Sequence, residues 1–269
     1  MNAKERRFVS TVMAYYEKHG RHDLPWRSTR DPYHIAVSEV MLQQTQVQRV
    51  IEKYKEFLHT FPTVSALANA KLSQVLRVWS GLGYNRRAKF LHQMALAVVK
   101  QYKGVFPNTL DELRTLPGIG PYTAGALYAF AYNKPYAVIE TNIRTVYMDY
   151  FFTEKTAVTD AELLPIISLT LNKKNPRVWY WALMDYGAHL KASGVRNNTK
   201  SKHYTKQSAF KGSKREVRGM VLKRLLQKPL TLQALMHSTH FERERLQEVL
   251  TQLEKEGLVK KTKQTFSVM

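Results

Sequence analysis

The segment from Leu116 to Thr123, LPGIGPYT, combines residue types and a spacing that could bind phosphate. It lies between a capping-box spacing, Thr109 with Glu112, and the apolar run TAGALYAFAY, which predicts a helix, a hairpin and a second helix. Gly118 and Gly120 allow backbone torsions that other residues avoid, so the amides of the turn can point outward. Those amides and the start of the second helix would hold a nucleic-acid phosphate without reading sequence. A plain tight turn is the alternative.

The charge of the chain favours a polyanionic partner. Its 269 residues carry 42 Lys and Arg against 21 Asp and Glu, a formal net charge of +21, with an isoelectric point of about 10.0. A field this positive attracts nucleic acid or an anionic membrane surface. No apolar run approaches the roughly 20 residues that span a bilayer, and no strongly basic helix with an exposed aromatic face stands out. We therefore expect nucleic acid and no membrane.

The positive charge is densest after residue 190. Residues 191–224 hold 11 basic side chains and one acid, Glu216. Because the stretch is rich in Ser, Asn, Thr and Gly and lacks apolar periodicity, we predict a basic linker or arm over 191–213. Phosphate contacts, which steepen the salt dependence of binding, are expected from this arm. The residues predicted to make them are Lys200, Lys202 and Lys206. A solvated, disordered connector is the alternative.

The chain contains no cysteine. Disulfides, thiolate zinc sites, cysteine-held iron–sulfur clusters and a cysteine nucleophile are therefore excluded. No dedicated ligand set is visible, so we expect no metal and no cofactor, with a monovalent cation at the hairpin carbonyls as the one option. The charged start of the chain has no apolar core behind it, so we expect no signal peptide and a cytoplasmic, nucleoid-associated protein.

The first 190 residues are typical of helices joined by short turns. Residues 4–18 place apolar side chains at helical spacing. Asp31 and Pro32 predict an N-cap followed by proline at the first helical position. Thr159 and Glu162 repeat the capping-box spacing before LLPIISLTL. Because β-branched alternation is scarce, we predict that this part is all-α.

The last 55 residues have a different pattern. Residues 215–227 are basic and amphipathic, 231–236 predict a short second helix, and 241–254 predict a third. Gly257 is followed by LVKK and TFSV, which predict a hairpin. Three helices and a hairpin indicate a small winged-helix-like domain over 214–269. A three-helix interaction domain without DNA contact is the alternative.

Five further segments carry a resemblance to a known family. They are Leu24-Pro25-Trp26-Arg27, Asp31-Pro32-Tyr33, SEVMLQQTQV from Ser38, GLGYNRRAKFLH from Gly81 and MDYGA from Met184. Together with LPGIGPYTAGA, in this order, they resemble the helix-hairpin-helix (HhH-GPD) DNA glycosylases of the endonuclease III type. Within that superfamily the adenine glycosylase branch, MutY, is the most similar. The resemblance spans about residues 24–191.

The family's fold implies a two-lobed helix-hairpin-helix glycosylase core at residues 1–190. A six-helix lobe would span about 32–145 and include the hairpin at 116–120. A second lobe would combine residues 1–31 with 146–190. The basic linker and the winged-helix-like domain would follow this core.

The resemblance also implies a reaction and the acids that carry it. Base excision extrudes a nucleotide from the stack and hydrolyses its N-glycosidic bond through an oxocarbenium-like sugar. Glu39 lies at the family's general-acid position, which protonates adenine N7 and needs a raised pKa in a dry pocket. Glu140 lies at the position of the catalytic Asp that stabilises the cation and positions water. Tyr122 and Asn142 match residues that support the same centre. A helix-surface acid is the alternative for Glu39.

Further contacts with DNA and with the extruded base follow from the resemblance. Gln44 and Tyr84 match residues that wedge into the duplex, with a packed aromatic as the alternative for Tyr84. The remaining predicted DNA contacts are Gly118, Gly120, Thr123, Arg86 and Arg87. The side chains predicted to line the substrate pocket are Trp26, Arg27, Met41 and Leu42.

Tyr122 also predicts a subtype. Bifunctional relatives carry Lys at this position, and its amine forms a Schiff base and cuts the strand. Because a phenol cannot form that imine, the resemblance implies a monofunctional glycosylase that leaves an abasic site. Such an enzyme scans double-stranded DNA, by default as a monomer. Weak lyase chemistry by another lysine, such as Lys134, is the alternative.

Three departures from the family pattern leave the target base open. Glu140 and Thr141 replace the usual Asp and Gly, and a displacement of about 1 Å in such a site costs roughly 100-fold in rate. The four-cysteine cluster after MDYGA and the 8-oxoguanine recognition domain are absent, and the basic arm and the winged-helix-like domain stand in their places. Adenine opposite 8-oxoguanine or guanine is the leading target. A thymine-, uracil- or modified-pyrimidine-type glycosylase and an inactive DNA-binding protein are the alternatives.

Overall fold

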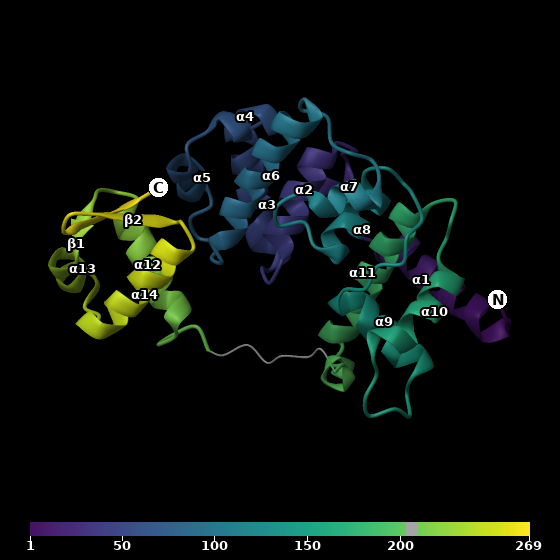
Figure 1. Cartoon of the computed structure of the whole chain (residues 1–269). Helices are drawn as coiled ribbons and strands as arrows, with labels where there is room; N and C mark the ends of the chain where they lie inside the picture. The colour runs from purple at the N-terminus through teal and green to yellow at the C-terminus, as the bar shows by residue number, and fades with distance from the viewer. Residues whose placement is uncertain (203–208) are drawn as a thin grey trace. The chain divides into compact units, whose positions relative to one another are not determined.

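A computed structural model describes residues 1–202 and 209–269 of the chain (Figure 1). The described residues are mostly helical, which confirms the predicted all-α core. No helix among them is long and apolar enough to cross a membrane. The α-helices before residue 202 are α1 (Ala3–His19), α2 (Pro32–Leu42), α3 (Val47–Thr60), α4 (Val64–Asn69), α5 (Leu72–Val78), α6 (Arg86–Tyr102), α7 (Leu110–Thr115), α8 (Pro121–Phe130), α9 (Thr141–Phe151), α10 (Asp160–Thr170) and α11 (Pro176–Ala192). Two short 3₁₀ helices are η1 (Pro25–Arg27) and η2 (Asn197–Lys200).

The chain forms two compact units, and each collects segments that are distant in sequence. The first unit combines residues 1–39, 108–115 and 119–206, and the second combines 40–107, 116–118 and 207–269. The predicted bounds of the lobes, the linker and the C-terminal domain stay a prediction.

The first unit is built around α1, α9 and α11. A capping box between Asn2 and Glu5 starts α1, whose apolar face then buries Phe8 completely. The Phe8 ring meets those of Tyr147 and Trp179 at centroid distances of 4.9 and 6.0 Å. Buried aromatic rings remove large apolar areas from water, so this cluster fixes the two helices, α9 and α11, that carry much of the candidate site.

The second unit is centred on α6, which packs against α4 and α5. Apolar residues follow the helical period along α6 and bury Ala88, Leu91, Ala95 and Val98. Trp79, after α5, is fully buried, and its indole nitrogen donates to the Gly83 carbonyl at 3.0 Å. This contact anchors the loop that precedes α6 and carries Tyr84.

The C-terminal part of the second unit has the predicted three helices and hairpin. They are α12 (Lys214–Leu225), α13 (Leu232–Thr239), α14 (Arg243–Lys255), β2 (Val259–Thr262) and β3 (Thr265–Val268). A two-residue strand, β1 (Leu230–Thr231), was not predicted; it pairs with β3 and gives the sheet order β1-β3-β2. All pairs are antiparallel. The arrangement is that of a winged helix.

The start of the predicted basic linker is structured. The α11 helix continues through Lys191 to Ala192, so the first residue assigned to the linker is helical. Asn197 donates to Asp149 Oδ1 at 2.8 Å, and Ser201 forms a parallel bridge with Val158. These contacts join residues that are distant in sequence and involve polar groups. They leave no apolar periodicity, so the sequence pattern indicated an extended segment.

Candidate active site

Glu39 is a buried carboxyl on α2. Asp31 begins this helix by accepting from the Tyr33 amide at 2.8 Å, and the sequence that follows is apolar on almost every face. The Glu39 side chain is 6% exposed, so the helix-surface alternative is wrong. Burial raises the pKa of this carboxyl to about 7, a hydrogen bond from Tyr122 lowers it and the charge of Glu140 raises it. Glu39 therefore has the protonation behaviour of a general acid near neutral pH.

Tyr122 contacts Glu39 directly. It is the second residue of α8, immediately after the hairpin, and its hydroxyl donates to Glu39 Oε2 at 2.9 Å. Burial and the two nearby carboxyls hold the pKa of Tyr122 well above its usual value. The phenol therefore stays neutral and acts as a hydrogen-bond donor to the acid.

Glu140 caps the N-terminus of α9. Its Oε1 accepts from the backbone amides of Asn142 and Ile143 at 2.7 and 3.2 Å. Burial raises the pKa of Glu140, while Lys191 and the two amides act in the opposite direction. The two amide donors and the helix N-terminus thus favour the charged carboxylate of Glu140, whereas the Tyr122 hydroxyl donates to Glu39.

Lys191 completes this end of the site, and the sequence interpretation missed it by assigning it to the linker. Its Nζ donates to Asn142 Oδ1 at 2.6 Å. Burial lowers the pKa of Lys191, and the charge of Glu140 raises it. One turn earlier on α11, a Cβ at Gly187 would lie 2.5 Å from the Asn142 carbonyl oxygen, so only glycine allows this approach. The glycine of MDYGA and the lysine four residues after it were the available signal.

Arg27, predicted in the substrate pocket, is committed to an ion pair. Its two terminal nitrogens donate to Asp185 at 2.7 and 2.8 Å, and both groups are buried. Arg21 joins them through its backbone amide and its Nε, at 2.8 and 2.7 Å. Arg27 acts on the site at a distance, because its charge lowers the pKa of Glu39. Asp185 is a supporting residue that the sequence interpretation did not single out.

Gly118 and Gly120 have different roles in the hairpin. Gly118 has φ +76°, and a Cβ there would lie 2.5 Å from the Phe90 Cβ, so this position requires glycine. Gly120 has φ −80° as the N-cap of α8, and no atom within 4 Å would meet its Cβ. Gly120 therefore does not use the torsions that glycine alone allows, because its backbone lies in a region open to every residue.

A comparison with protein families decides the assignment of this core. Residues 37–165, which contain the two glutamates, Tyr122 and the hairpin, match the HhH-GPD superfamily of base excision DNA repair proteins. Residues 37–165 of this chain belong to that superfamily. Among the described residues, no group of three or more His, Asp or Glu side chains is arranged to hold a metal ion.

Curated relatives of the HhH-GPD core include adenine DNA glycosylases. That of Buchnera aphidicola subsp. Acyrthosiphon pisum is 36% identical over 186 residues, 68% of this chain and 53% of the relative. That of Mycolicibacterium smegmatis is 46% identical over 136 residues, 50% of this chain and 46% of the relative. The chain thus spans about half the length of these curated relatives.

Solved structures of the superfamily have the same fold. A thermostable thymine-DNA glycosylase has a TM-score of 0.61 and 27% identity, over 69% of this chain and 86% of that chain. A non-covalent endonuclease III–DNA complex also has a TM-score of 0.61, at 18% identity, over 73% of this chain and 91% of that chain. These likenesses confirm the predicted glycosylase fold.

Arg87, predicted to contact DNA, binds the protein's own backbone. Its Nη1 donates to the carbonyls of Val40 and Met41 at 2.9 and 3.0 Å, at the C-terminal end of α2. Its Nη2 donates to the carbonyls of Leu82 and Gly83, both at 3.2 Å. Because helix C-termini attract cations and the guanidinium fork is occupied, Arg87 positions α2 and the following loop.

Gln44 and Tyr84, the predicted wedge residues, share an uncommon backbone conformation. Their φ angles are +54° and +47°, in the left-handed region that non-glycine residues rarely adopt. Tyr84 is 38% exposed, so the packed-aromatic alternative is not supported. Strained backbone at exposed side chains is concentrated at functional sites in proteins.

The remaining residues predicted to contact DNA or to line the substrate pocket differ in how exposed their side chains are. Arg86 and Lys202 are exposed, and Lys200 donates to the Thr153 carbonyl at 2.9 Å. Thr123 is 3% exposed, so its side chain offers no accessible surface to a phosphate. In the substrate-pocket set, Trp26 and Met41 are buried and Leu42 is half-buried. Lys206 lies outside the described residues.

Proposed function

We propose that this protein is a monofunctional adenine DNA glycosylase of base excision repair. It hydrolyses the N-glycosidic bond of an adenine extruded from double-stranded DNA, where it is mispaired with guanine or 8-oxoguanine. The observation that carries the proposal is the buried Glu39 carboxyl, with its pKa raised to about 7, hydrogen-bonded by Tyr122 and influenced by the charge of Glu140. The adenine DNA glycosylases similar to this chain support the choice of base.

The two carboxyls divide the reaction between them. Protonated Glu39 donates its proton to adenine N7 while the C1′–N9 bond breaks, and the bonding electron pair leaves with the base. The sugar becomes an oxocarbenium-like cation, which the ionised Glu140 stabilises. Water then adds to C1′, and the proton it releases restores the acid form of the carboxyl pair. The products are free adenine and an abasic site.

The side chain at position 122 supports the monofunctional assignment. A phenol forms no Schiff base with the sugar, and Tyr122 is already committed to Glu39. Lys134, the alternative amine, donates to the Asn108 carbonyl at 3.0 Å and lies over the Tyr128 ring at 5.2 Å. We propose no cofactor for the reaction and a monomeric enzyme; a monovalent cation at the hairpin stays a prediction.

Single-turnover excision tests this proposal. Duplexes would carry adenine opposite guanine or 8-oxoguanine, or thymine or uracil opposite guanine, and each would be analysed with and without alkali. We expect loss of adenine alone, with strand cleavage only after alkali, and no excision by Glu39→Gln. Excision of thymine would instead support the function of the thymine-DNA glycosylase that this chain resembles. Cleavage without alkali, with a borohydride-trapped complex, would contradict the monofunctional assignment.

A further inference from the structure

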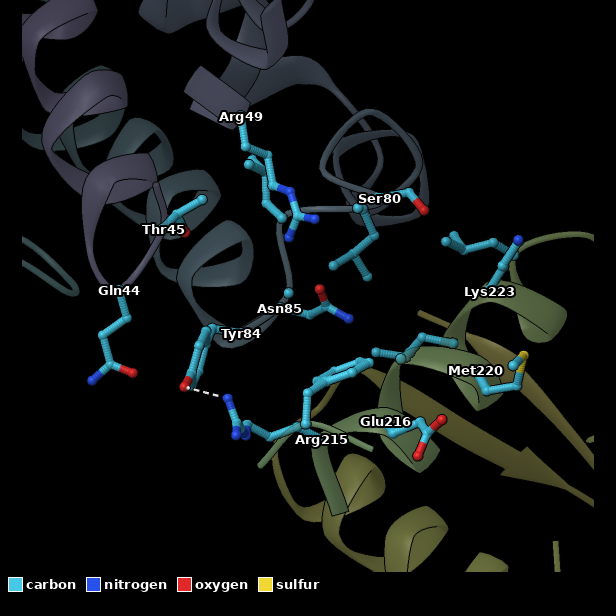
Figure 2. Close-up of a pocket in the computed structure, with 18 of the residues that line it drawn as sticks. Gln44, Thr45, Arg49, Ser80, Tyr84, Asn85, Arg215, Glu216, Met220 and Lys223 are labelled. Carbon is cyan, nitrogen blue, oxygen red and sulfur yellow. Dashed lines mark hydrogen bonds between the residues drawn. The ribbon is translucent and has the colours of Figure 1, made fainter. Parts of the chain in front are cut away.

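A cavity of about 780 Å³ lies within the second unit, beside the Tyr84 loop (Figure 2). One wall comes from Gln44, Tyr84 and Asn85, and the other comes from the winged helix, mainly α12 with Phe210 before it. The volume lies in the usual range of roughly 300–1,000 Å³ for ligand pockets. The reaction proposed above uses none of these α12 residues.

Arg215 and two aromatic rings meet at this cavity. Arg215 Nη1 donates to the Tyr84 hydroxyl at 3.2 Å, the contact drawn as a dashed line in Figure 2. The guanidinium lies 5.9 Å from the Tyr84 ring centroid and 6.0 Å from that of Phe210. Phe210 is 60% exposed, so its ring is accessible to a ligand. Exposed rings beside an arginine are the arrangement on which unpaired nucleobases stack.

The Tyr84 wall is held in place before any ligand binds. The left-handed backbone of Gln44 and Tyr84 is maintained by Arg87, which binds the carbonyls of Gln43, Leu82 and Gly83. A wall fixed in this way loses little conformational entropy when a ligand enters. The pocket is therefore preorganised on this side.

The distribution of charge makes α12, among the helices of the winged helix, the one that attracts a phosphate-bearing ligand. The α12 helix carries five basic residues and one acid, Glu216, which accepts from the Gly212 amide at 2.6 Å. The third helix, α14, which follows the turn of the helix-turn-helix pair, carries three basic and three acidic residues. A phosphate-bearing ligand is attracted to α12, and α14 offers it no net positive charge.

We propose that this pocket binds a guanine nucleotide of the strand opposite the excised base. Arg215 donates to O6 and N7 of the guanine, and the rings of Tyr84 and Phe210 stack on its faces. The arginine fork matches these two acceptors, whereas adenine presents an amino donor in place of O6. This inference rests on the proposed function, because it assigns the base that pairs with the target. The winged helix thus selects the mispair.

Binding of DNA that carries no excisable base tests the pocket separately from catalysis. The full chain would be titrated, by fluorescence anisotropy, with duplexes that contain a tetrahydrofuran abasic analogue opposite guanine, 7-deazaguanine or a second tetrahydrofuran. We expect guanine to bind about tenfold more tightly than the other two, because only guanine offers both acceptors and a ring. Arg215→Gln abolishes this preference, and Arg243→Gln, an exposed arginine on α14, retains it.

Phe210→Ala provides a second, independent variant, since its side chain is exposed and its loss leaves the core intact. It lowers affinity for guanine and 7-deazaguanine alike, because both bases stack on the ring. Equal binding of the three duplexes by the wild-type chain, or an unchanged guanine preference in Arg215→Gln, would overturn the proposal. The chain could fail to excise adenine and still prefer guanine, with that preference lost in Arg215→Gln. The proposed reaction would then be wrong, and the proposed guanine site would be supported.

Discussion

Lys191 Nζ and Asn142 Oδ1 lie 2.6 Å apart, which joins the C-terminal turn of α11 to the first turn of α9. Glu140 caps that same turn of α9, and the charge of Lys191 lowers its pKa. A single ammonium group thus orients the amide of Asn142 and favours the charged form of Glu140. Glu140, which replaces the family's shorter aspartate, thus has a lysine nearby that favours its charged form.

Replacement of Lys191 by methionine should raise the pKa of Glu140, because the cation that favours the carboxylate is removed. Since the proposed reaction needs ionised Glu140, the acidic limb of the excision–pH profile should move to higher pH. At neutral pH the single-turnover rate should fall by about tenfold. Lys173→Met, at an exposed lysine outside the site, is the control and should leave the profile unchanged. Identical profiles for the two variants would refute this role.

Tyr122→Phe removes the hydrogen bond that lowers the pKa of Glu39. The pKa should therefore rise further, by about one unit, as expected for the loss of one hydrogen bond to a charged group. Glu39 must be protonated to act, so the pH above which excision declines should increase. Single-turnover rates across pH measure this limb directly. A shift to lower pH would mean that another group is the acid.

Glu39→Gln should abolish excision but stabilise the fold in alkaline solution. The pKa of Glu39 is raised to about 7 in the folded chain, so its contribution to stability is complete below the unfolded value and is lost as pH rises through 7. The full loss corresponds to about 3 kcal/mol, which a glutamine does not incur. Urea unfolding of both chains at about pH 5 and about pH 9 measures the difference. Equal pH dependence would show that Glu39 titrates normally.

Alanine should destabilise the protein at Gly118 and have little effect at Gly120, the two hairpin glycines. Gly118→Ala places a Cβ against Phe90 at positive φ, and the left-handed backbone alone costs about 1–2 kcal/mol. Gly120→Ala meets no neighbour and has an ordinary φ, so its stability should change little. Thermal unfolding and DNA affinity, measured side by side, separate the two positions. Equal losses in both variants would contradict this assignment.

Much of the fold was predictable because its signals are local. The capping box of Thr159 with Glu162 and the helix from Pro32 lie where the sequence placed them. The β1 strand was missed because two residues carry no periodicity. Glu39 and Tyr122 were accessible only through a motif, since their contact joins residues 83 apart in sequence.

Sequence patterns could not predict the contacts that support the candidate active site. Arg87 was predicted to contact DNA because the sequence shows its positive charge. The sequence does not show which backbone carbonyls the guanidinium binds in the fold. Lys191 was assigned to a linker because the residues after it are polar. In both cases a cation's partner is decided by tertiary packing, which brings together segments about 50 residues apart.

The guanidinium of Arg87 spans two segments with different tasks. One side holds the last carbonyls of the helix that carries Glu39, and the other holds the loop that presents Tyr84. A displacement of that loop must therefore either break hydrogen bonds to Arg87 or carry the end of the helix with it. In the proposed function, the loop that contacts the opposite strand and the helix that carries the acid are therefore mechanically coupled through one arginine side chain.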